Sequence, residues 1–463
     1  MWFRRDLRIA SNPALASASR EAQLRGSSVI ALFVLDPRLQ ATSGPNRLAF
    51  LYEALRSLRE SGVPLVIRSG DPAREIAAIA HESAADLVVC TKDFTPYGRA
   101  RDQRVSDTLR SVGVTLAQQG SPYVVPPGTV LKDDGSPFKV FTPFRRVWER
   151  HVFAGIHNSR PAVGDASDVR WMEQDSLEVP ASPTEGSVFL PRASEDAAWR
   201  RLEHFVEHNL RTYDVARNYP SQDSTSYLSA YLKFGLLHPA QILPVVANGE
   251  VGGEVFRAEL GWREFYADVL WHRPETVTNA FAPAMESIEV DEGEVADEHF
   301  AAWCHGRTGY PFVDAGMRQL QRDGWMHNRV RMVVASFLVK DLHLDWRRGA
   351  AWFMQHLVDG DIASNQHGWQ WTAGTGTDAS PYYRVFNPVM QGKKFDENGD
   401  YIRRYVPELA QLTGREVHEP WSLNGGGLFG GVDGYPARIV DHATERSEAL
   451  ARYGAVKDSV ARA

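Results

Sequence analysis

The sequence predicts a two-part protein, with an α/β region at the amino-terminal end and an all-helical region behind it. Over residues 1–125, short apolar runs alternate with helical patterns, which predicts a parallel, Rossmann-like sheet covered by helices. Residues 126–194 are rich in Pro, Gly, Ser and acids, and are expected to form a connector. Over residues 195–455, long helical periods and dense aromatic side chains predict an all-helical domain. The length of 463 residues is enough for two or three domains.

Four apolar runs are the expected strands of the sheet. The longest covers residues 29–35, and shorter runs lie at 65–67, 87–90 and 114–116. A continuous apolar run indicates a strand that is buried on both faces. Asp71 and Pro72 predict the start of an alanine-rich helix, because Asp caps helices and Pro fits their first turn. This region lacks the GxGxxG and GxxxxGK[ST] motifs, which argues against an ordinary dinucleotide or P-loop site.

Charge and cysteine content narrow the class of protein. The formal net charge is −7, so any contact with nucleic acid has to come from a local basic patch. Cys90 and Cys304 lie far apart, which argues against a disulfide framework and suits a reducing cytoplasm. No CxxC pair or His cluster indicates a metal site, and no window reaches the length of a membrane span. Residues 443–463 are expected to form a short final helix with a frayed end.

A helix expected at residues 254–272 carries a face of mixed chemistry. Its members at i, i+3, i+4 and i+7 are Glu259, Trp262, Arg263 and Tyr266. A core face would be aliphatic, and a solvated face would rarely carry the aromatic rings. The pattern therefore favours the wall of a polar pocket over an ordinary amphipathic surface.

Two further segments are candidates for the same pocket. On a helix expected at residues 325–340, one face holds Asn328, Arg331 and Met332, although an Arg there is more often a salt-bridge partner than a ligand. The stretch 359–371 places acids beside small residues and two indoles, which suits a planar ligand whose ring or ribose groups donate hydrogen bonds. A turn followed by two core tryptophans explains that stretch equally well.

Six motifs resemble, in order, those of the photolyase/cryptochrome family, and in particular those of class I cyclobutane pyrimidine dimer (CPD) photolyases of the deazaflavin-antenna type. The similarity runs from the first residues to about Pro420 and covers both regions. Only Met1 precedes the first motif, so the first strand is expected to be short or the true start to lie elsewhere. The motifs are Trp2–Arg8, Tyr231–Gly235, Trp262–Tyr266, Gly309–Pro311, Asp359–Trp371 and Arg384–Pro388.

The resemblance implies that the helical domain binds FAD in a folded, U-shaped form. Arg331 and Asp359 match the charge pair beside the isoalloxazine ring. Asp361 would hold the flavin edge, and Asn365 would face N5. The full set of residues that match the FAD site is Tyr213, Thr225, Ser226, Leu228, Ser229, Arg263, Asn328, Arg331, Asp359, Asp361 and Asn365. Tyr227 and Phe256 differ from the Arg and Trp of some relatives.

The resemblance also implies a light-driven carbon–carbon lyase that acts on pyrimidine dimers in double-stranded DNA. An electron passes from excited, fully reduced FAD to a flipped-out dimer, the dimer splits, and the electron returns. By position, Glu259 would hydrogen-bond the dimer and stabilise its transient anion. Trp262 and Trp371 would stack on the dimer. Met332 would pack beneath it, and Asn328 would lie between flavin and lesion.

Two more sets of residues follow from the same resemblance. Arg217, Arg329 and Arg384 match the contacts to DNA phosphates, with Lys393, Lys394, Arg403 and Arg404 as further contacts or as plain solvated surface. Trp346 and Trp369 match the inner members of a tryptophan chain that re-reduces the flavin. Gly293 takes the usual place of the outer member, within an acidic stretch that has no Trp or Tyr, and Trp303 is a candidate substitute.

The amino-terminal domain of this family carries a light-harvesting antenna. Residues 96–102 resemble the motif of relatives that bind 8-hydroxy-5-deazaflavin, and Lys233 takes the position that those relatives use at the domain interface. Arg47 and Asp93 are further candidates by position. Methenyltetrahydrofolate, FMN and an empty site are the alternatives.

Other members of the family perform other functions. A cryptochrome-like photoreceptor usually has a long carboxyl-terminal extension, and little follows Gly454 here. A (6-4) photolyase usually has a second histidine where Asn328 stands. A DASH-type photolyase differs around that helix, and a light-independent flavin oxidoreductase would need a nicotinamide motif that the sequence lacks. We expect the protein to be cytoplasmic. We also expect a monomer, because a cavity that faces DNA has to stay open.

Overall fold

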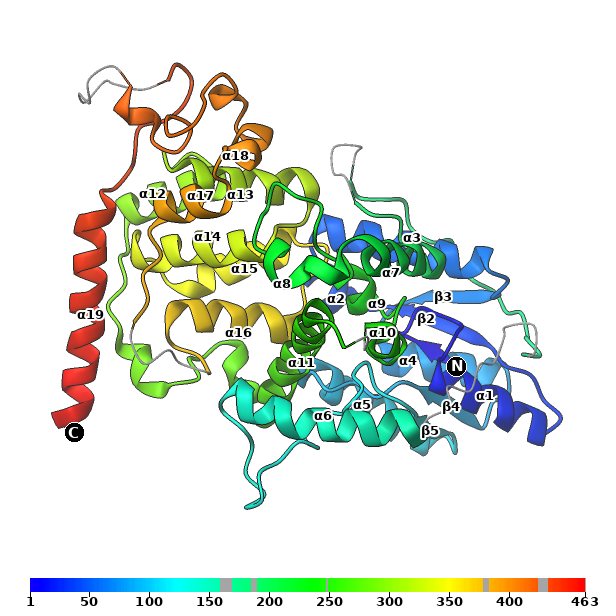
Figure 1. The fold of residues 1–463 in the computed structure, drawn as a ribbon. Helices are drawn as coiled ribbons and strands as arrows, with labels where there is room; N and C mark the ends of the chain where they lie inside the picture. Colours follow the sequence, from blue (N-terminus) through cyan, green and yellow to red (C-terminus); the bar gives the residue numbers. More distant parts are fainter. Residues whose placement is uncertain (159–168, 185–189, 247–248, 378–382, 424–431, 463) are drawn as a thin grey trace.

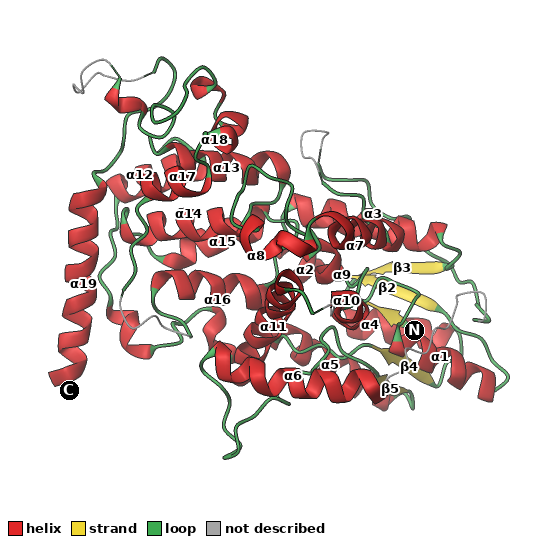
Figure 2. Ribbon diagram, viewed as in Figure 1, coloured by secondary structure: helices red, strands yellow, loops and turns green. Residues whose placement is uncertain are grey.

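The computed structural model describes residues 1–158, 169–184, 190–246, 249–377, 383–423 and 432–462. A sheet with its covering helices forms one half of the molecule, and helices alone form the other (Figure 1). Figure 2 shows that the strands are confined to the amino-terminal half. The predicted fold class, an α/β region followed by an all-helical region, is confirmed.

All strands of the sheet run parallel, in the order β3-β2-β1-β4-β5. The first strand is short, as expected, and pairs with its neighbours through Trp2, opposite Leu32 and Cys90. Each of the four predicted apolar runs overlaps a strand, with ends that shift by at most two residues. The strands are β1 (Trp2–Phe3), β2 (Ala31–Leu35), β3 (Leu65–Ser69), β4 (Leu87–Cys90) and β5 (Thr115–Gln118).

Helices cover both faces of this sheet, which explains why its strands are apolar throughout. Phe33 and Ile67 belong to the core shared with α1 and α3, whereas Leu32 and Val66 belong to the core under α4 and α5. Asp71 caps α4 by accepting hydrogen bonds from the next two backbone amides, as predicted. The helices of this half are α1 (Pro13–Leu24), α2 (Pro37–Thr42), α3 (Pro45–Glu60), α4 (Pro72–Glu82) and α5 (Pro96–Ser111).

A long helix, α6 (Phe141–Asn158), lies within the stretch that the sequence predicts to be a connector. Phe141, Phe144 and Trp148 bury one side of it against α11. Their spacing is helical, but the Pro- and Gly-rich stretch before Phe141 masks this signal in the sequence.

The second half consists of helices α7 to α19 and short 3-10 turns. The predicted helix at 254–272 is α11, and the one at 325–340 begins three residues later, because His327 accepts a hydrogen bond from the Arg329 amide and caps it. The final helix is longer than expected. The helices are α7 (Glu195–His208), α8 (Tyr213–Ala216), α9 (Ser229–Phe234), α10 (Pro239–Val246), α11 (Val251–His272), α12 (Glu294–Cys304), α13 (Pro311–Asp323), α14 (Asn328–Lys340), α15 (Trp346–His356), α16 (Ile362–Ala373), α17 (Pro388–Phe395), α18 (Asp400–Tyr405) and α19 (His442–Arg462).

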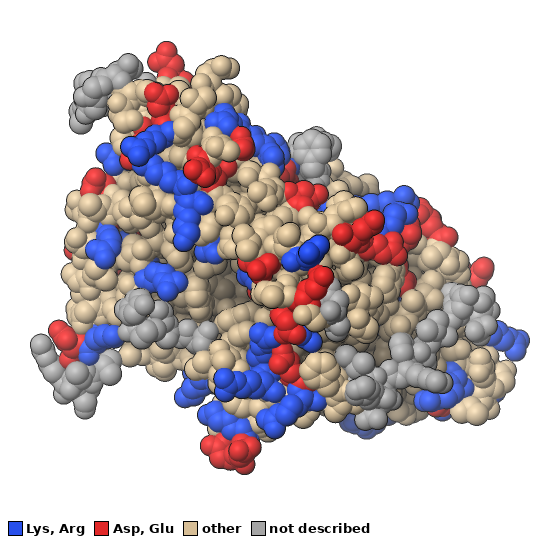
Figure 3. Space-filling view, in the orientation of Figure 1, with Lys and Arg blue, Asp and Glu red and all other residues tan. Residues whose placement is uncertain are grey.

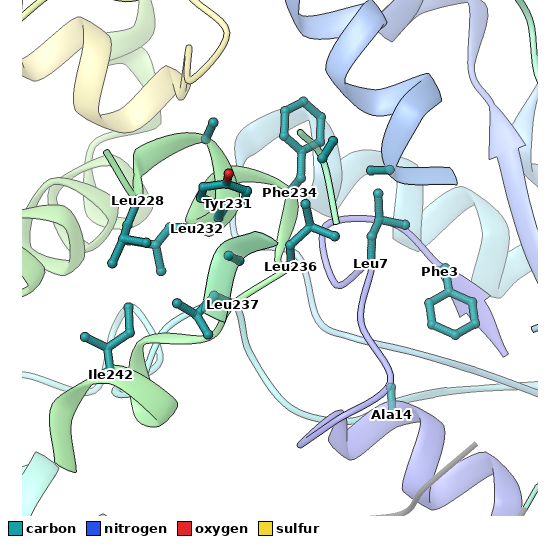
Figure 4. Packing of buried hydrophobic residues seen from close by; sticks show 14 of the residues in the cluster. Phe3, Leu7, Ala14, Leu228, Tyr231, Leu232, Phe234, Leu236, Leu237 and Ile242 are labelled. Atoms are coloured by element: carbon teal, nitrogen blue, oxygen red, sulfur yellow. The ribbon is translucent and has the colours of Figure 1, made fainter. Parts of the chain in front are cut away.

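The two halves share one hydrophobic core. Figure 4 shows Leu7, from the loop after β1, lying near Leu236 and Phe234, which belong to the segment at the end of α9. The Leu7 amide also donates a hydrogen bond to the Phe234 carbonyl, and Arg8 donates to the Gly235 carbonyl. The first loop therefore joins the sheet firmly to the helices that line the candidate site. None of the helices described here is long and apolar enough to cross a bilayer.

Candidate functional site

Helices α8, α11, α14 and α16 surround a hollow in the surface. α11 packs on α8 and α16, and α16 packs on α14. Figure 3 shows the surface hollowed between these helices, with Lys and Arg side chains on both sides of it. Because the polar faces predicted on 254–272 and 325–340 belong to α11 and α14, the fold brings together the segments that the sequence singles out.

Glu259 of α11 and Arg217, which follows α8, form an ion pair. The Arg217 Nη1 lies 2.6 Å from the Glu259 Oε1, and both side chains keep a quarter to a third of their surface exposed, at 25% and 32%. Arg217 follows directly on α8, and its guanidinium also lies over the Tyr213 ring. Burial, and then the Glu259 charge, raise the pKa of the Tyr213 phenol above its usual value. A solvent-accessible carboxylate is thus held in place by a neighbouring cation.

Aromatic rings form one wall of the site. The Trp262 ring stacks on Phe141, with ring centroids 3.8 Å apart and planes 14° apart, and it also contacts Tyr266. Tyr266 in turn stacks on His367 of α16. Trp262 is half-buried, as is Trp371 at the far end of α16. Half-exposed, rigidly held indoles offer flat apolar surfaces to a planar ligand.

Arg331 and Asp359 pair as predicted. The Arg331 Nη2 lies 2.9 Å from the Asp359 Oδ2, and its Nε donates to the Met326 carbonyl. The other carboxylate oxygen, Asp359 Oδ1, is buried and has no hydrogen-bond partner among the described residues. The same holds for the Thr225 hydroxyl. Buried polar atoms are normally satisfied, so both atoms fit a ligand that is rich in hydrogen-bonding groups, such as a flavin dinucleotide.

Asp361 lies where the two halves meet. Its Oδ1 caps α16 by accepting from the amides of Ala363 and Ser364, while its Oδ2 accepts from Arg5 at 2.7 Å and lies 3.7 Å from the Lys233 ammonium. Burial opposes ionisation, but Arg5 and Lys233 overcome it and hold the pKa of Asp361 well below its usual range. Arg5 is not among the predicted site residues, although it belongs to the first motif, Trp2–Arg8.

Arg263, a predicted flavin residue, makes contacts with the amino-terminal half. It donates to the carbonyls of Pro122 and Leu232 at 3.0 and 3.3 Å, and its guanidinium lies over the Tyr123 ring. Arg263 therefore ties α11 to the loop after β5 while its charge also lowers the pKa of Asp361.

Two other residues, which are not among the predicted site residues, support the site from behind. Glu264, buried on the opposite side of α11, accepts from the amides of Val124 and Val125 and from the Trp148 indole. Arg201 of α7 donates to the carbonyls of Thr225 and Ser226. No spacing signal marks either one, because their partners are distant in sequence.

The remaining predicted flavin residues lie on the same helices or next to them. Asn365 is buried in α16, and its amide group donates to the Ala350 carbonyl and to Gln366. Asn328 is exposed at the start of α14, and Met332 lies half-buried one turn later. Leu228 is buried, and Ser229 is exposed at the start of α9.

Three predicted DNA-contacting arginines, Arg217, Arg329 and Arg384, lie close enough to interact. Burial lowers the pKa of Arg329, and the charges of Arg217 and Arg384 lower it further. Burial and the nearby arginines also lower the pKa of His327 to about 3, which keeps this imidazole neutral. Such a group of cations attracts phosphates.

The four additional basic candidates differ among themselves. Lys393 pairs with Glu419, and Arg403 pairs with Asp400, so these two side chains have partners within the protein. Arg404 donates to the Ser221 carbonyl, and Lys394 lies over the Phe395 ring. The ion pairs favour the plain-surface alternative for Lys393 and Arg403.

The candidate electron-transfer tryptophans lie in the core behind the hollow. Trp369 is 3% exposed, and its ring rests on Gly349 of α15, where a Cβ would come within 2.1 Å of the indole. Trp346, at the start of α15, is 5% exposed. Gly293 precedes α12 with a φ of +90°, and Trp303 at the other end of α12 is completely buried.

The predicted antenna residues lie between the sheet and the helical half. Arg47 is buried and donates to the carbonyls of Met354, Leu357 and Thr42. Asp93 accepts from Arg101 and from Thr95. Burial, and then the Arg5 charge, lower the pKa of Lys233 to about 7. Each of these residues thus has partners within the protein.

Comparison with known proteins agrees with this arrangement. A family described as "FAD binding domain of DNA photolyase" matches residues 256–455, and one described as "DNA photolyase" matches residues 1–162. The chain is 37% identical to the deoxyribodipyrimidine photo-lyase of Escherichia coli (strain K12) over 476 residues, which cover 99% of this chain and 98% of that relative.

Solved structures resemble it over almost the whole length. A class III photolyase from Agrobacterium tumefaciens has a TM-score of 0.87 and 35% identity, covering 99% of this chain and 97% of that one. A Synechocystis cryptochrome has a TM-score of 0.84 and 27% identity, with 97% of each chain covered. A Sulfolobus tokodaii photolyase with two FAD molecules has a TM-score of 0.79 and 27% identity, with 98% of each covered. The chain belongs to the photolyase/cryptochrome family and carries that family's FAD-binding domain.

Proposed function

We propose that this protein is a deoxyribodipyrimidine photo-lyase that repairs CPDs in double-stranded DNA with light. The observation that carries the proposal is that three features lie on helices that pack against one another. These are the Arg217–Glu259 pair, the half-exposed indole of Trp262, and the Arg331–Asp359 pair with its unsatisfied oxygen. Curated relatives of nearly the same length are named for this activity.

The fit of the residues to FAD rests on buried polar atoms that lack partners in the protein. Asp359 Oδ1 and Thr225 Oγ1 would accept or donate hydrogen bonds at the ring and at the phosphate–ribose part, respectively. Arg331 would hold the Asp359 carboxylate in place through its hydrogen bond. Asn365 would face the ring from α16. When bound and reduced, FAD supplies an excited-state electron; the protein supplies position and electrostatics.

The lesion-facing residues of this chain would act on a dimer that has left the duplex. Photolyases are among the enzymes that take their target bases out of the stack, which costs a few kcal/mol. Trp262 and Trp371 would offset part of this cost by stacking. Glu259, held by Arg217, would hydrogen-bond the dimer and stabilise the charge that develops there. Asn328 and Met332 would close the pocket from α14.

The cluster of Arg217, Arg329 and Arg384 would bind the phosphates that flank the lesion. Because Arg217 and Arg384 both lie close to Arg329, a duplex would dock with the phosphates of its damaged strand along this group. Their charges would give the protein local attraction for DNA despite a net charge of −7.

For the antenna we propose 8-hydroxy-5-deazaflavin, bound near Lys233, Asp93 and Arg47. The motif at residues 96–102 and the position of Lys233 support this assignment. A flavin or methenyltetrahydrofolate is the alternative, and the Sulfolobus relative with two FAD molecules illustrates the first. The absorption spectrum of protein purified from a deazaflavin-producing host decides between them, since a spectrum of FAD alone would refute the assignment.

We also propose that the protein is a class I enzyme and a cytoplasmic monomer. Both cysteines are buried and free, which suits a reducing compartment. Gel filtration with and without dimer-containing DNA tests the monomer.

The assay that tests the main proposal uses FAD-loaded, chemically reduced protein and duplex DNA that contains CPDs, under blue light and in the dark. Repair is expected only in the light, and to fall strongly in Glu259→Ala and Trp262→Ala. Trp271→Ala is the matched control, because Trp271 lies on the same helix but packs against Lys92 and Arg99 of the amino-terminal half. Failure of the illuminated wild type would favour a cryptochrome-like photoreceptor, and repair of (6-4) lesions alone would favour a (6-4) photolyase.

A further inference from the structure

The core behind the hollow contains a line of aromatic rings that leads away from Trp369. The Trp369 and Trp303 rings lie edge to face, with centroids 6.1 Å apart. Phe353 bridges the same two rings, at 4.9 Å from Trp369 and 6.2 Å from Trp303. From Trp303 the line continues through Phe300, at 5.9 Å, to Trp352, at 6.3 Å from Phe300.

The tryptophans at the two ends of this line differ in exposure to solvent. Trp369 and Trp303 are 3% and 0% exposed, whereas Trp352 is half-exposed on α15. The Trp303 indole donates its N–H to the Val334 carbonyl, so no base is placed to take that proton. A buried indole with such a partner can pass an electron to its neighbour, but it cannot receive one directly from a reductant in solution.

Trp352 has the surroundings of a terminal donor. Its ring packs on the His356 imidazole, with centroids 4.1 Å apart, and burial lowers the pKa of that histidine, which keeps it neutral. A neutral neighbour does not oppose a positive charge on the indole, as a cation would. The half-exposed ring is also within reach of small molecules in solution.

We propose that Trp303 and Trp352 form the route by which electrons from solution reach a flavin bound beside Trp369. The proposal rests on the proposed function only in requiring a bound flavin, and it concerns how that flavin becomes reduced, not how DNA is repaired. A route through Trp303 and Trp352 does not require an aromatic residue at position 293, where this chain has glycine. Trp346, the other neighbour expected for Trp369, is 5% exposed, and residues 289–298 around Gly293 contain no Trp or Tyr.

Each step moves one electron. After light absorption Trp369 gives one electron to the flavin and takes one from Trp303, which takes one from Trp352. The deficit on Trp352 is filled by a thiol in the medium, which loses a proton and is oxidised toward its disulfide. The net result is one electron moved from the thiol to the flavin per photon used.

The experiment follows flavin absorbance in protein loaded with oxidised FAD and illuminated with blue light in the presence of dithiothreitol. Trp352→Phe is expected to slow photoreduction by about tenfold or more, because phenylalanine is not oxidised under these conditions. Trp352→Tyr should restore part of the rate, since a phenol can donate an electron. Trp421→Phe is the control: Trp421 is equally half-buried in this core but contacts Tyr310 and Arg438.

A second variant separates the two routes. Trp346→Phe should leave most of the rate intact if electrons arrive through Trp303. An unchanged rate in Trp352→Phe, or loss of the rate in Trp346→Phe alone, would overturn the proposal. Trp303→Phe should resemble Trp352→Phe; if that core variant does not bind FAD, the surface variant decides.

Failure of the proposed function gives a different result. Wild-type protein that photoreduces normally when loaded with oxidised FAD, but does not repair CPDs after chemical reduction, would refute the repair function and leave the electron route standing. Chemically reduced Trp352→Phe is expected to repair at the wild-type rate, because reduction by a chemical reagent bypasses the route.

Discussion

Arg5 donates a hydrogen bond to Asp361 across the junction of the two halves, with the Arg5 Nη2 2.7 Å from the Asp361 Oδ2. Arg5 follows the first strand of the sheet, and Asp361 caps the helix that carries Asn365, Trp369 and Trp371. The start of the chain thus fixes the position of α16, and with it one side of the candidate flavin site.

Arg5→Ala is expected to lower the free energy of unfolding by about 1.5–3 kcal/mol, the usual contribution of a hydrogen bond to a charged group. The Lys233 ammonium at 3.7 Å limits the loss, because it still offsets the Asp361 charge. Urea unfolding at neutral pH measures the effect. Arg20→Ala, on the exposed side of α1, is the control and should change little. A loss no larger than that of the control would show that the Arg5–Asp361 contact does not join the halves.

The same contact predicts a pH dependence. The folded-state pKa of Asp361 lies below the unfolded value of about 3.9. The ionised carboxylate therefore stabilises the fold fully above about pH 3.9, and this stabilisation is lost as the pH falls from there toward the folded-state pKa. Between about pH 6 and about pH 3, the free energy of unfolding should fall less in Asp361→Asn than in the wild type. Equal slopes for the two proteins would contradict the assignment.

Removing one member of the Arg331–Asp359 pair should do more harm than removing both. Asp359→Ala leaves Arg331 without its partner, and breaking a buried pair in this way costs about 3–5 kcal/mol. The double variant Arg331→Met/Asp359→Leu should therefore be more stable than either single truncation, while its FAD content after gel filtration stays low. FAD bound at the wild-type ratio in Asp359→Ala would show that this carboxylate does not hold the cofactor.

DNA binding should depend on salt through the arginine cluster. Each phosphate contact contributes about 0.9 to the slope of log K against log salt concentration for duplex DNA. Arg329→Ala and Arg384→Ala should each reduce that slope by about one contact, for damaged and undamaged duplexes alike. Arg74→Ala, exposed on α4 of the sheet half, should leave the slope unchanged. Fluorescence anisotropy over a range of salt concentrations measures these slopes.

Local signals in the sequence predict much of the fold. The Asp71 cap, the apolar strands and the helix at 254–272 all appear where the pattern places them, because each depends on side chains a few residues apart. α6 is the counterexample. The sequence shows its apolar face at residues 141, 144 and 148. Only the contacts with α11 show that the helix belongs in the core.

The sequence by itself determined the family, the two-part architecture and the residue types of a flavin and DNA site, since ordered motifs and helical spacing are carried by the chain alone. Only the tertiary structure decided which side chains meet. Arg5 with Asp361, Arg217 with Glu259, and Trp303 with Trp369 are separated by 356, 42 and 66 residues, and no periodicity links such positions. Their pairing depends on how the helices pack, because contacts and burial arise only when distant segments share one core.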